Sequence, residues 1–249
     1  MTATPEDRAW RTYWWLEERL APGVRYAQVD FEERLVSTVR AGDTWLDVGC
    51  GHTLLPEWRA SQERELLERP EVVVGLDPEL AALREHRGLS LRVCGDAAHL
   101  PFAERTFDLV TANMVVEHLA QPEDQFREIA RVLKEGGRFL FHTPNAHGYP
   151  TMMARAVPDR VRGLAARMLE ARPTDDRFST YYRANTAASI GEVSRRTGFV
   201  VDGMLLVRST AVFWRFAPLA ALELLFLRAL AQPGLASLRP NLIALLRKE

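Results

Sequence analysis

Short apolar runs alternate with helical patterns along most of this 249-residue chain, and this alternation limits the fold more than any other feature. The runs are rich in β-branched or aromatic residues and are bounded by Gly, Pro or Asp, as buried strands are. They predict strands at 44–48, 72–76, 91–94, 107–112, 138–142, 204–207 and 242–246. Helical spacing occupies 56–68, 79–86 and 122–133. The order of elements predicts an α/β fold with a parallel sheet that helices cover on both faces.

The flanks of this pattern predict lid elements within a single domain of residues 1–249. We expect an N-terminal helical lid at 1–43, which includes a helix at 29–40 with Phe31, Leu35 and Val39 on one face. A ligand-binding core follows at 44–145, and residues 146–249 supply lid insertions and the last two strands. Ligands of parallel α/β sheets bind at the carboxyl ends of the strands, so the functional residues are expected there.

An apolar stretch at 211–231 predicts a helix that packs on the domain or on a second copy of the chain. Its residues Leu219, Leu222, Phe226 and Leu230 fall at helical spacing, with Glu223 and the arginines off this stripe. A homodimer through residues 211–231 is therefore one expectation. The charged residues also break every window long enough to span a bilayer, so no membrane span is expected.

Composition excludes several classes of partner. The chain has 32 basic and 33 acidic residues and a net charge of −1, with the arginines scattered among acids. A nucleic-acid partner is therefore not expected. Two cysteines and the lack of a secretory signal predict a cytoplasmic protein.

The segment from Trp45 to Gly51 is an apolar strand that ends in an acid and a Gly-x-Gly turn. Glycines let a backbone turn tightly and approach a ligand without a Cβ in the way. A dinucleotide fingerprint would place glycine where this chain has Leu54, which argues against a nicotinamide oxidoreductase. Asp77 follows the second strand, where a carboxylate accepts from a ribose diol, and Asp96 follows the third, where it can accept from a purine amine. The pattern predicts a nucleoside ligand with a polar tail.

These residues resemble the class I S-adenosylmethionine-dependent methyltransferases, within the broad small-molecule group that includes the ubiquinone-biosynthesis methyltransferases. The resemblance runs from about Thr44 to Asn145. It is carried by Leu46-Asp47-Val48-Gly49-Cys50-Gly51, Val74-Gly75-Leu76-Asp77-Pro78, Gly95-Asp96-Ala97, Phe107-Asp108-Leu109-Val110, Val116-Glu117-His118-Leu119 and Arg131-Val132-Leu133-Lys134-Glu135-Gly136-Gly137. It implies a Rossmann-like sheet of seven strands, mostly parallel, in which the last strand runs antiparallel beside the fifth.

The resemblance also implies S-adenosyl-L-methionine as cofactor and a set of residues around it. The residues after the first strand surround the methionyl tail, those after the second hold the ribose hydroxyls, and those after the third flank the adenine. In chain order the implied cofactor residues are Asp47, Gly49, Cys50, Gly51, Asp77, Pro78, Asp96, Ala97, Asn113 and Met114. The family turn usually has a third glycine where this chain has Thr53, and a Cβ there narrows the cradle.

The expected function is methyl transfer from this cofactor to a small organic acceptor, by in-line displacement and at oxygen. Holding the acceptor in line supplies much of the rate, and a neutral histidine could remove a hydroxyl proton. His142 and His118 are the base candidates. Some relatives in this family bind a divalent metal ion through a Glu-x-x-Glu-His motif. Here Glu117 and His118 match the last two residues of the motif, but Met114 stands in place of its first carboxylate, and no metal is expected.

The acceptor pocket is predicted from polar and aromatic residues that follow the strands or lie in the lids. They are Tyr13, Tyr26, Glu117, Asn145, Tyr149, Tyr181, Tyr182 and Arg183. The run Asn113-Met114-Val115-Val116 lacks the motif typical of methyltransferases that act on the amino groups of nucleic-acid bases. The alternative hypothesis is a non-catalytic cofactor-binding regulatory or partner subunit on the same fold, which Thr53 and the lack of a compelling base leave open.

Overall fold

The computed structural model describes residues 4–157 and 178–249, so residues 158–177 of the lid insertions predicted within 146–249 lie outside the described residues. The chain divides into two compact units. One, the sheet unit, comprises residues 31–143, 180–205 and 242–249. The other, the helical unit, comprises residues 1–30, 144–179 and 206–241. The predicted division into one domain with a lid at 1–43 and a core at 44–145 stays a prediction.

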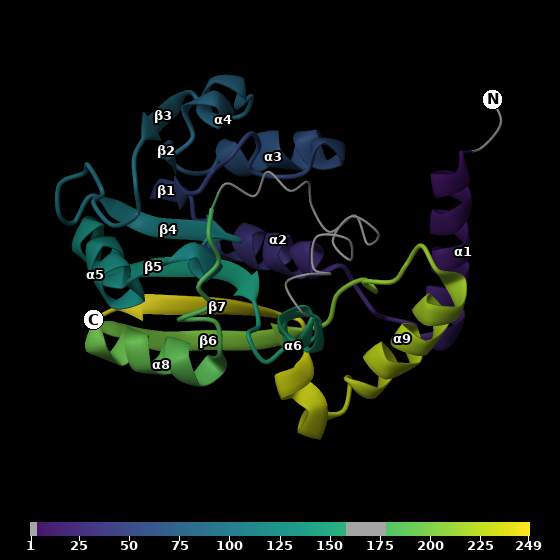
Figure 1. Cartoon of the computed structure of the whole chain (residues 1–249). Helices are drawn as coiled ribbons and strands as arrows, with labels where there is room; N and C mark the ends of the chain where they lie inside the picture. The colour runs from purple at the N-terminus through teal and green to yellow at the C-terminus, as the bar shows by residue number, and fades with distance from the viewer. Residues whose placement is uncertain (1–3, 158–177) are drawn as a thin grey trace. The chain divides into compact units, whose positions relative to one another are not determined.

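Seven strands form one sheet in the order β3-β2-β1-β4-β5-β7-β6, which Figure 1 shows from top to bottom. Their bounds are β1 Thr44–Val48, β2 Val72–Asp77, β3 Leu91–Cys94, β4 Phe107–Asn113, β5 Leu133–Pro144, β6 Phe199–Val207 and β7 Asn241–Lys248. Strands β1 to β5 pair in parallel, so their carboxyl ends share one edge of the sheet. Strand β7 lies antiparallel beside β5, as the resemblance implies. The predicted Rossmann-like fold class is confirmed.

The helices follow the predicted positions with shifted ends. Their bounds are α1 Pro5–Leu20, α2 Ala27–Thr38, η1 Glu57–Arg59, α3 Ala60–Leu67, α4 Leu80–Glu85, η2 Val116–His118, α5 Pro122–Val132, α6 Tyr149–Ala156, α8 Ala187–Arg196, α9 Ala217–Ala229 and η3 Pro233–Leu238. The helix predicted at 56–68 begins as the 3₁₀ turn η1, and β5 begins at Leu133 rather than at residue 138. In the described part of the chain, no helix is both long and apolar enough to cross a bilayer.

Alternation along β5 explains why helices cover both faces of the sheet. Phe139 and Phe141 contact the ring of Phe126 on α5, at centroid distances of 5.4 and 5.9 Å. His142, the next residue after Phe141, points to the other face, where its ring stacks on Phe31 of α2 at a centroid distance of 5.7 Å. Successive side chains of a strand point to opposite faces, so α5 and α2 cover opposite sides of this strand. His142, which pairs with Asn113 of β4, therefore lies under α2.

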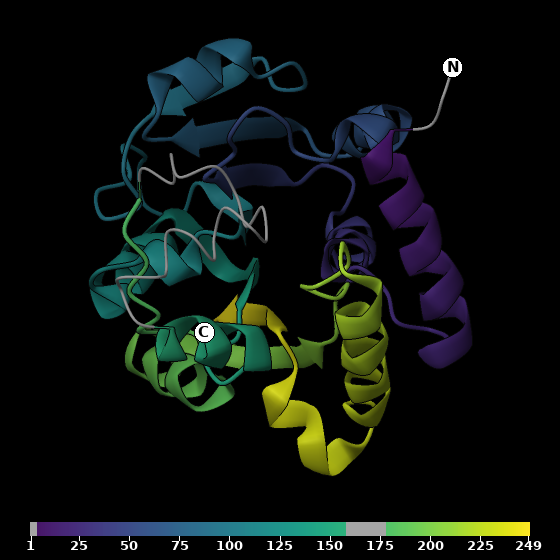
Figure 2. The same cartoon turned by 45° about the vertical axis from the view of Figure 1, so that its right-hand side comes forward.

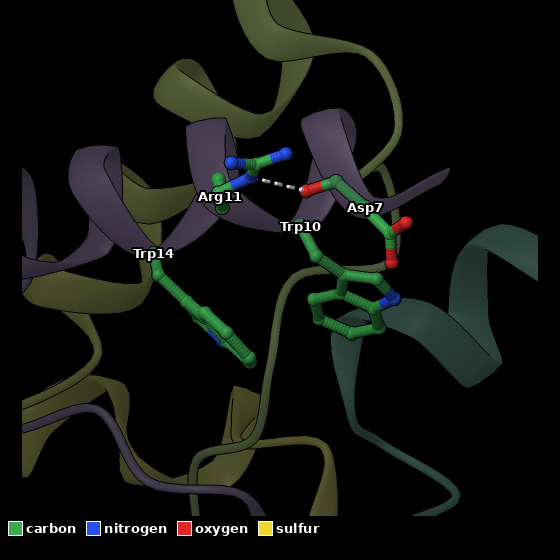
Figure 3. Close-up of a pocket in the computed structure, with 4 residues that line it drawn as sticks. All are labelled: Asp7, Trp10, Arg11 and Trp14. Atoms are coloured by element: carbon green, nitrogen blue, oxygen red, sulfur yellow. Dashed lines mark hydrogen bonds between the residues drawn. The ribbon is translucent and has the colours of Figure 1, made fainter. Parts of the chain in front are cut away.

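The helical unit is built on contacts between α1 and α9, which lie side by side in Figure 2. The ring of Trp10 stacks on Trp214 at 3.9 Å, and the Tyr13 hydroxyl accepts from the backbone N–H of Ala211 at 3.1 Å. Along α1, a hollow of about 420 Å³ is lined by Asp7, Trp10, Arg11 and Trp14 (Figure 3). Both indoles point to the same side of the helix in this view.

The apolar helix predicted in 211–231 buries only part of its predicted packing stripe within this chain, since Leu230 is fully buried and its other members are exposed. Leu219 and Leu222 of the predicted packing stripe are 46% and 66% exposed, whereas Glu223 is 7% exposed. The carboxylate of Glu223 accepts from the backbone N–H groups of Val212 and Phe213, at 2.8 Å each, and from the Tyr149 hydroxyl. A carboxylate that accepts three hydrogen bonds can be buried, so Glu223 lies on the buried side of α9. Leu219 and Leu222 consequently lie on the exposed side of the helix. Dimerisation through residues 211–231 stays a prediction.

His86, the residue that follows α4, is expected to make the stability of the sheet unit depend on pH. His86 is 4% exposed, and its Nδ1 accepts from the backbone N–H groups of Gly88 and Leu89 at 3.2 Å each. Burial lowers the pKa of His86, with Arg92 and His52 acting in the same direction. A histidine whose pKa is lowered by folding binds more protons when unfolded, so its contribution to stability is lost as pH falls through its unfolded pKa.

We therefore expect His86→Asn, whose amide oxygen replaces Nδ1 as acceptor, to lose less stability than wild type on acidification. The difference in unfolding free energy between the two proteins should be constant above about pH 7 and change in favour of the variant below about pH 6.5. Urea titrations across this range measure it. A difference that stays constant with pH would show that His86 titrates alike in both states.

Candidate functional site

The turn after β1 is held open by two glycines. Gly49 and Gly51 have φ of +70° and +55°, a conformation that residues with a Cβ rarely adopt. The N–H groups of Gly49 and Cys50 both donate to the carbonyl of Leu76, at 2.7 and 3.2 Å, which ties the turn to β2. A Cβ added at Gly49 would lie 2.3 Å from Cγ2 of Val115, whereas one at Gly51 would meet no protein atom within 4 Å. The turn is therefore closed on one side by Val115 and open beside Gly51.

Asp77, at the end of β2, links this turn to the next helix. One of its carboxylate oxygens accepts from the N–H of Gly51 at 3.0 Å and the other from the N–H of Glu79 at 2.8 Å. It is 8% exposed. Each carboxylate oxygen has a further lone pair, so Asp77 keeps the capacity to accept from a diol while it orders both loops. Pro78 follows it, and its carbonyl accepts weakly from the Cys94 thiol, at 3.5 Å.

Asp47, at the end of β1, is buried beside a hydroxyl relay. The Thr111 hydroxyl donates to Asp47 at 2.5 Å and accepts from the indole N–H of Trp45 at 2.7 Å. These residues share a face because Trp45 and Asp47 are two apart on β1 and Asp47 pairs with Thr111 of β4. Burial raises the pKa of Asp47 to about 7, Thr111 lowers it, and the carboxylates of Asp77 and Glu63 raise it further.

The third strand end is more open. Asp96 is exposed, and its carboxylate accepts from the N–H of Ala98 at 2.9 Å, while Ala97 is 8% exposed. Thr53 is exposed, and its backbone does not have a positive φ. The turn therefore forms with an ordinary backbone where the family usually has its third glycine.

The ends of β4 and β5 join through an amide and an imidazole. The Asn113 Oδ1 atom lies 2.9 Å from Nδ1 of His142, and the N–H of Met114 donates to the His142 carbonyl at 2.8 Å. Because an amide oxygen only accepts, Nδ1 of His142 carries the proton in this contact and Nε2 is the basic nitrogen. Met114 has φ of +58°, so the chain leaves β4 through a strained residue.

Glu117, one of the predicted acceptor residues, is buried at the same edge of the sheet. It is 2% exposed, and its carboxylate accepts from the Thr143 hydroxyl at 2.9 Å, which in turn accepts from the Asn185 amide at 2.6 Å. The other carboxylate oxygen lies 3.9 Å from Nε2 of His118. Three segments that are far apart in sequence, at 117–118, 143 and 185, therefore meet at one buried carboxylate.

The segment at 181–183 is anchored to the same loop by its backbone. The N–H groups of Tyr181 and Tyr182 donate to the Glu117 carbonyl at 2.7 and 3.2 Å, and the Arg183 guanidinium donates to the carbonyl of Ala120 at 2.6 Å. The Tyr181 side chain is 45% exposed, with the Arg183 guanidinium 5.5 Å from its ring centroid. The structure thus brings the predicted acceptor residues Glu117 and Tyr181 to Arg183 together with His118.

The other predicted acceptor residues belong to the helical unit. Asn145 is 2% exposed, and its amide donates to the carbonyls of Ser237 and Arg239 at 2.7 and 2.8 Å. The hydroxyls of Tyr13 and Tyr149 are hydrogen-bonded within this unit, and burial raises the pKa of both. Tyr26 is 48% exposed. The contacts of the first three residues account for them as packing groups, and their acceptor role stays a prediction.

No cluster of three or more His, Cys, Asp or Glu side chains is arranged to hold a metal ion among residues 4–157 and 178–249. Sequence reasoning missed Thr111, Val115, Thr143 and Asn185. Their side chains contact residues that are distant in the sequence. Only the strand register could have pointed to Thr111, and no local sequence pattern distinguishes the other three residues.

Comparison with known proteins identifies the family to which this chain belongs. Residues 46–141 match the model of the methyltransferase domain. The chain is 30% identical to the demethylmenaquinone methyltransferase of Corynebacterium urealyticum over 177 residues, which are 64% of this chain and 74% of that protein. The chain belongs to the S-adenosylmethionine-dependent methyltransferases.

Two further methyltransferases show how far the similarity extends. The malonyl-[acyl-carrier protein] O-methyltransferase of Herminiimonas arsenicoxydans is 37% identical over 103 residues, which are 39% of this chain and 36% of that protein. The geranyl diphosphate C-methyltransferase of Streptomyces coelicolor, solved with Mg²⁺, geranyl diphosphate and S-adenosyl-L-homocysteine, superposes with a TM-score of 0.52 at 17% identity. That superposition covers 89% of this chain and 77% of the other, and it shows a shared fold.

The residues of this methyltransferase fit its cofactor, S-adenosylmethionine. The turn leaves space beside Gly51 that no protein atom fills, and carboxylates end β1 and β2. A methionyl tail, which carries an ammonium and a carboxylate, and a ribose diol are the groups that such a turn and such carboxylates can bind. The predicted enzyme class and cofactor are confirmed, while the individual residue roles stay predictions.

Proposed function

We propose that this methyltransferase transfers a methyl group to an oxygen of a small organic acceptor, with His118 as the base. The carrying observation is the adjacency of His118, the buried Glu117 carboxylate and the Tyr181–Arg183 segment at the carboxyl edge of the sheet. The two curated relatives described above support an organic acceptor, since one is named for demethylmenaquinone and the other as an O-methyltransferase.

The cofactor supplies an activated methyl group on sulfur when it is bound. The remaining work of the protein is to hold an acceptor oxygen in line and to take its proton. Nε2 of His118 lies 3.9 Å from the buried Glu117 carboxylate, at the edge where we place the acceptor. His142 is 4% exposed beneath Phe31 and bonds Asn113, so we assign it the positioning of the loop after β4. Tyr181 and Arg183 present the groups that select the acceptor.

The test incubates the pure chain with methyl-labelled S-adenosylmethionine and a panel of phenols, carboxylic acids and amines, with mass spectrometry of the products. Label on an acceptor oxygen is the expected result. Label on nitrogen or carbon only would overturn the oxygen assignment. Cofactor binding without transfer to any acceptor would instead favour the non-catalytic partner subunit.

Once an acceptor is known, we expect His118→Ala to lower kcat by about 100-fold or more, because general base catalysis contributes about that much. Its affinity for S-adenosyl-L-homocysteine should stay within about twofold of wild type, since the base faces the acceptor. The matched control is His99→Ala, at an exposed histidine elsewhere in the sheet unit, which should leave kcat unchanged. An unchanged kcat in His118→Ala would remove this residue from the chemistry.

A further inference from the structure

Asp47 is a buried carboxylate among groups that oppose its charge. It is 6% exposed near the end of β1, and the charged groups that act on it are the carboxylates of Asp77 at the end of β2 and of Glu63 on α3. The Cys50 thiol follows it in the turn and is itself buried. A carboxylate in this position holds its proton more tightly than an exposed one, both because it is desolvated and because two like charges lie nearby.

Thr111 opposes these effects through a hydroxyl whose direction is determined. The indole N–H of Trp45 can only donate, so the Thr111 oxygen accepts from it and the single hydroxyl hydrogen points to Asp47. A hydroxyl that already accepts one hydrogen bond donates a stronger one, and the 2.5 Å contact agrees with this. Donation to a carboxylate favours its charged form.

We propose that Thr111 is a positioning residue that sets the pH at which the enzyme binds its cofactor, through the charge state of Asp47. The inference rests on the proposed placement of the methionyl tail at Asp47. The ammonium of that tail is cationic, so its arrival beside Asp47 favours the carboxylate and expels the proton that the unliganded carboxyl holds. Cofactor binding is therefore linked to proton release, and affinity rises with pH until Asp47 is ionised in the free enzyme.

The experiment is calorimetric titration of S-adenosyl-L-homocysteine into wild type and Thr111→Val between about pH 6 and about pH 8.5. Each titration is repeated in two buffers of different ionisation enthalpy, which counts the protons released. Wild type should release protons near neutral pH, with an affinity about tenfold higher at the alkaline end than at the acid end.

Thr111→Val should displace the affinity curve to higher pH, so that it binds about tenfold more weakly near pH 7 and approaches wild type at the alkaline end. Thr111→Ser, which keeps the hydroxyl, should restore the wild-type curve. The control is Thr38→Val on α2, since the hydroxyl of Thr38 is similarly buried but bonds only the carbonyl of Arg34. A purely structural role of Thr111 would lower affinity by one factor at every pH, and that result would overturn the proposal.

A second measurement does not depend on how the Thr111 variants fold. Infrared difference spectra of wild type at neutral pH should lose a protonated-carboxyl band when S-adenosyl-L-homocysteine is added, and Asp47→Asn should lack that band. Binding with no proton release and no such band would overturn the inference alone. Failure of wild type to bind S-adenosyl-L-homocysteine at any pH would instead contradict the cofactor site.

Discussion

Gly49→Ala is expected to destabilise the enzyme by about 2–5 kcal/mol and to weaken binding of S-adenosyl-L-homocysteine by at least about tenfold. The left-handed backbone at this position, with φ of +70°, costs a residue with a Cβ about 1–2 kcal/mol. The new Cβ would also lie 2.3 Å from Cγ2 of Val115, so either the turn or the loop after β4 must move. Both segments belong to the proposed cofactor site.

Two further variants separate these causes. Gly42→Ala places a Cβ at φ of +77° with no protein atom within 4 Å, so it should show the backbone cost alone and leave cofactor affinity unchanged. Adding Val115→Ala to Gly49→Ala removes the clashing atom and should recover part of the lost affinity. Urea denaturation and calorimetry measure the two quantities. If Gly49→Ala and Gly42→Ala cost the same and bind alike, the contact with Val115 has no role.

Arg138→Met is expected to destabilise the sheet unit by about 3–5 kcal/mol, because it leaves a buried carboxylate without its partner. Arg138 is 6% exposed, and its guanidinium donates to both oxygens of Asp43 at 2.7 and 2.8 Å and to the carbonyl of Thr38. The contact joins β5 to the end of α2 and to the turn before β1.

The matched control is Arg247→Met, which breaks the exposed ion pair with Asp202 at 3.0 Å. Exposed pairs contribute about 1 kcal/mol or less, so this variant should unfold close to wild type. Replacing both partners of the buried pair, as Arg138→Met with Asp43→Asn, should cost less than Arg138→Met alone, since no unpaired charge remains. Equal losses for the single and double variants would show that packing, not charge, explains the effect.

The sheet was predictable because each strand has a local signature of alternating or continuous apolar residues between breakers. The ends of the strands were less predictable. Strand β5 already begins at Leu133 and includes Gly136 and Gly137, and β6 begins at Phe199 although Asp202 and Gly203 interrupt its apolar pattern. Neighbouring strands supply the hydrogen bonds that extend these segments, and single-sequence propensity contains no information on neighbours. The burial of Glu223 on α9 has the same origin, since its donors come from residues 149, 212 and 213.

That the predicted cofactor residues lie at one edge of the sheet was predictable for a different reason. Its glycines and strand-end carboxylates are consecutive or follow strands at the edge that parallel topology brings together. Thr111 is one of many β-branched residues in predicted strands, and only its register opposite Asp47 distinguishes it. Asn185 lies 42 residues from Thr143, to which it donates, so no sequence pattern could have paired them.

The way in which the segment at 181–183 is attached bears on how such an enzyme can acquire new acceptors. Two of its anchors are main-chain N–H groups bound to the carbonyl of Glu117. Every residue except proline offers that donor, so the side chain at Tyr181 can change without loosening the segment, although Tyr182 is held at φ of +52° and tolerates fewer replacements. If this segment meets the acceptor as we propose, substitutions at Tyr181 can change acceptor preference while the backbone anchors of the segment and the turn after β1 stay intact.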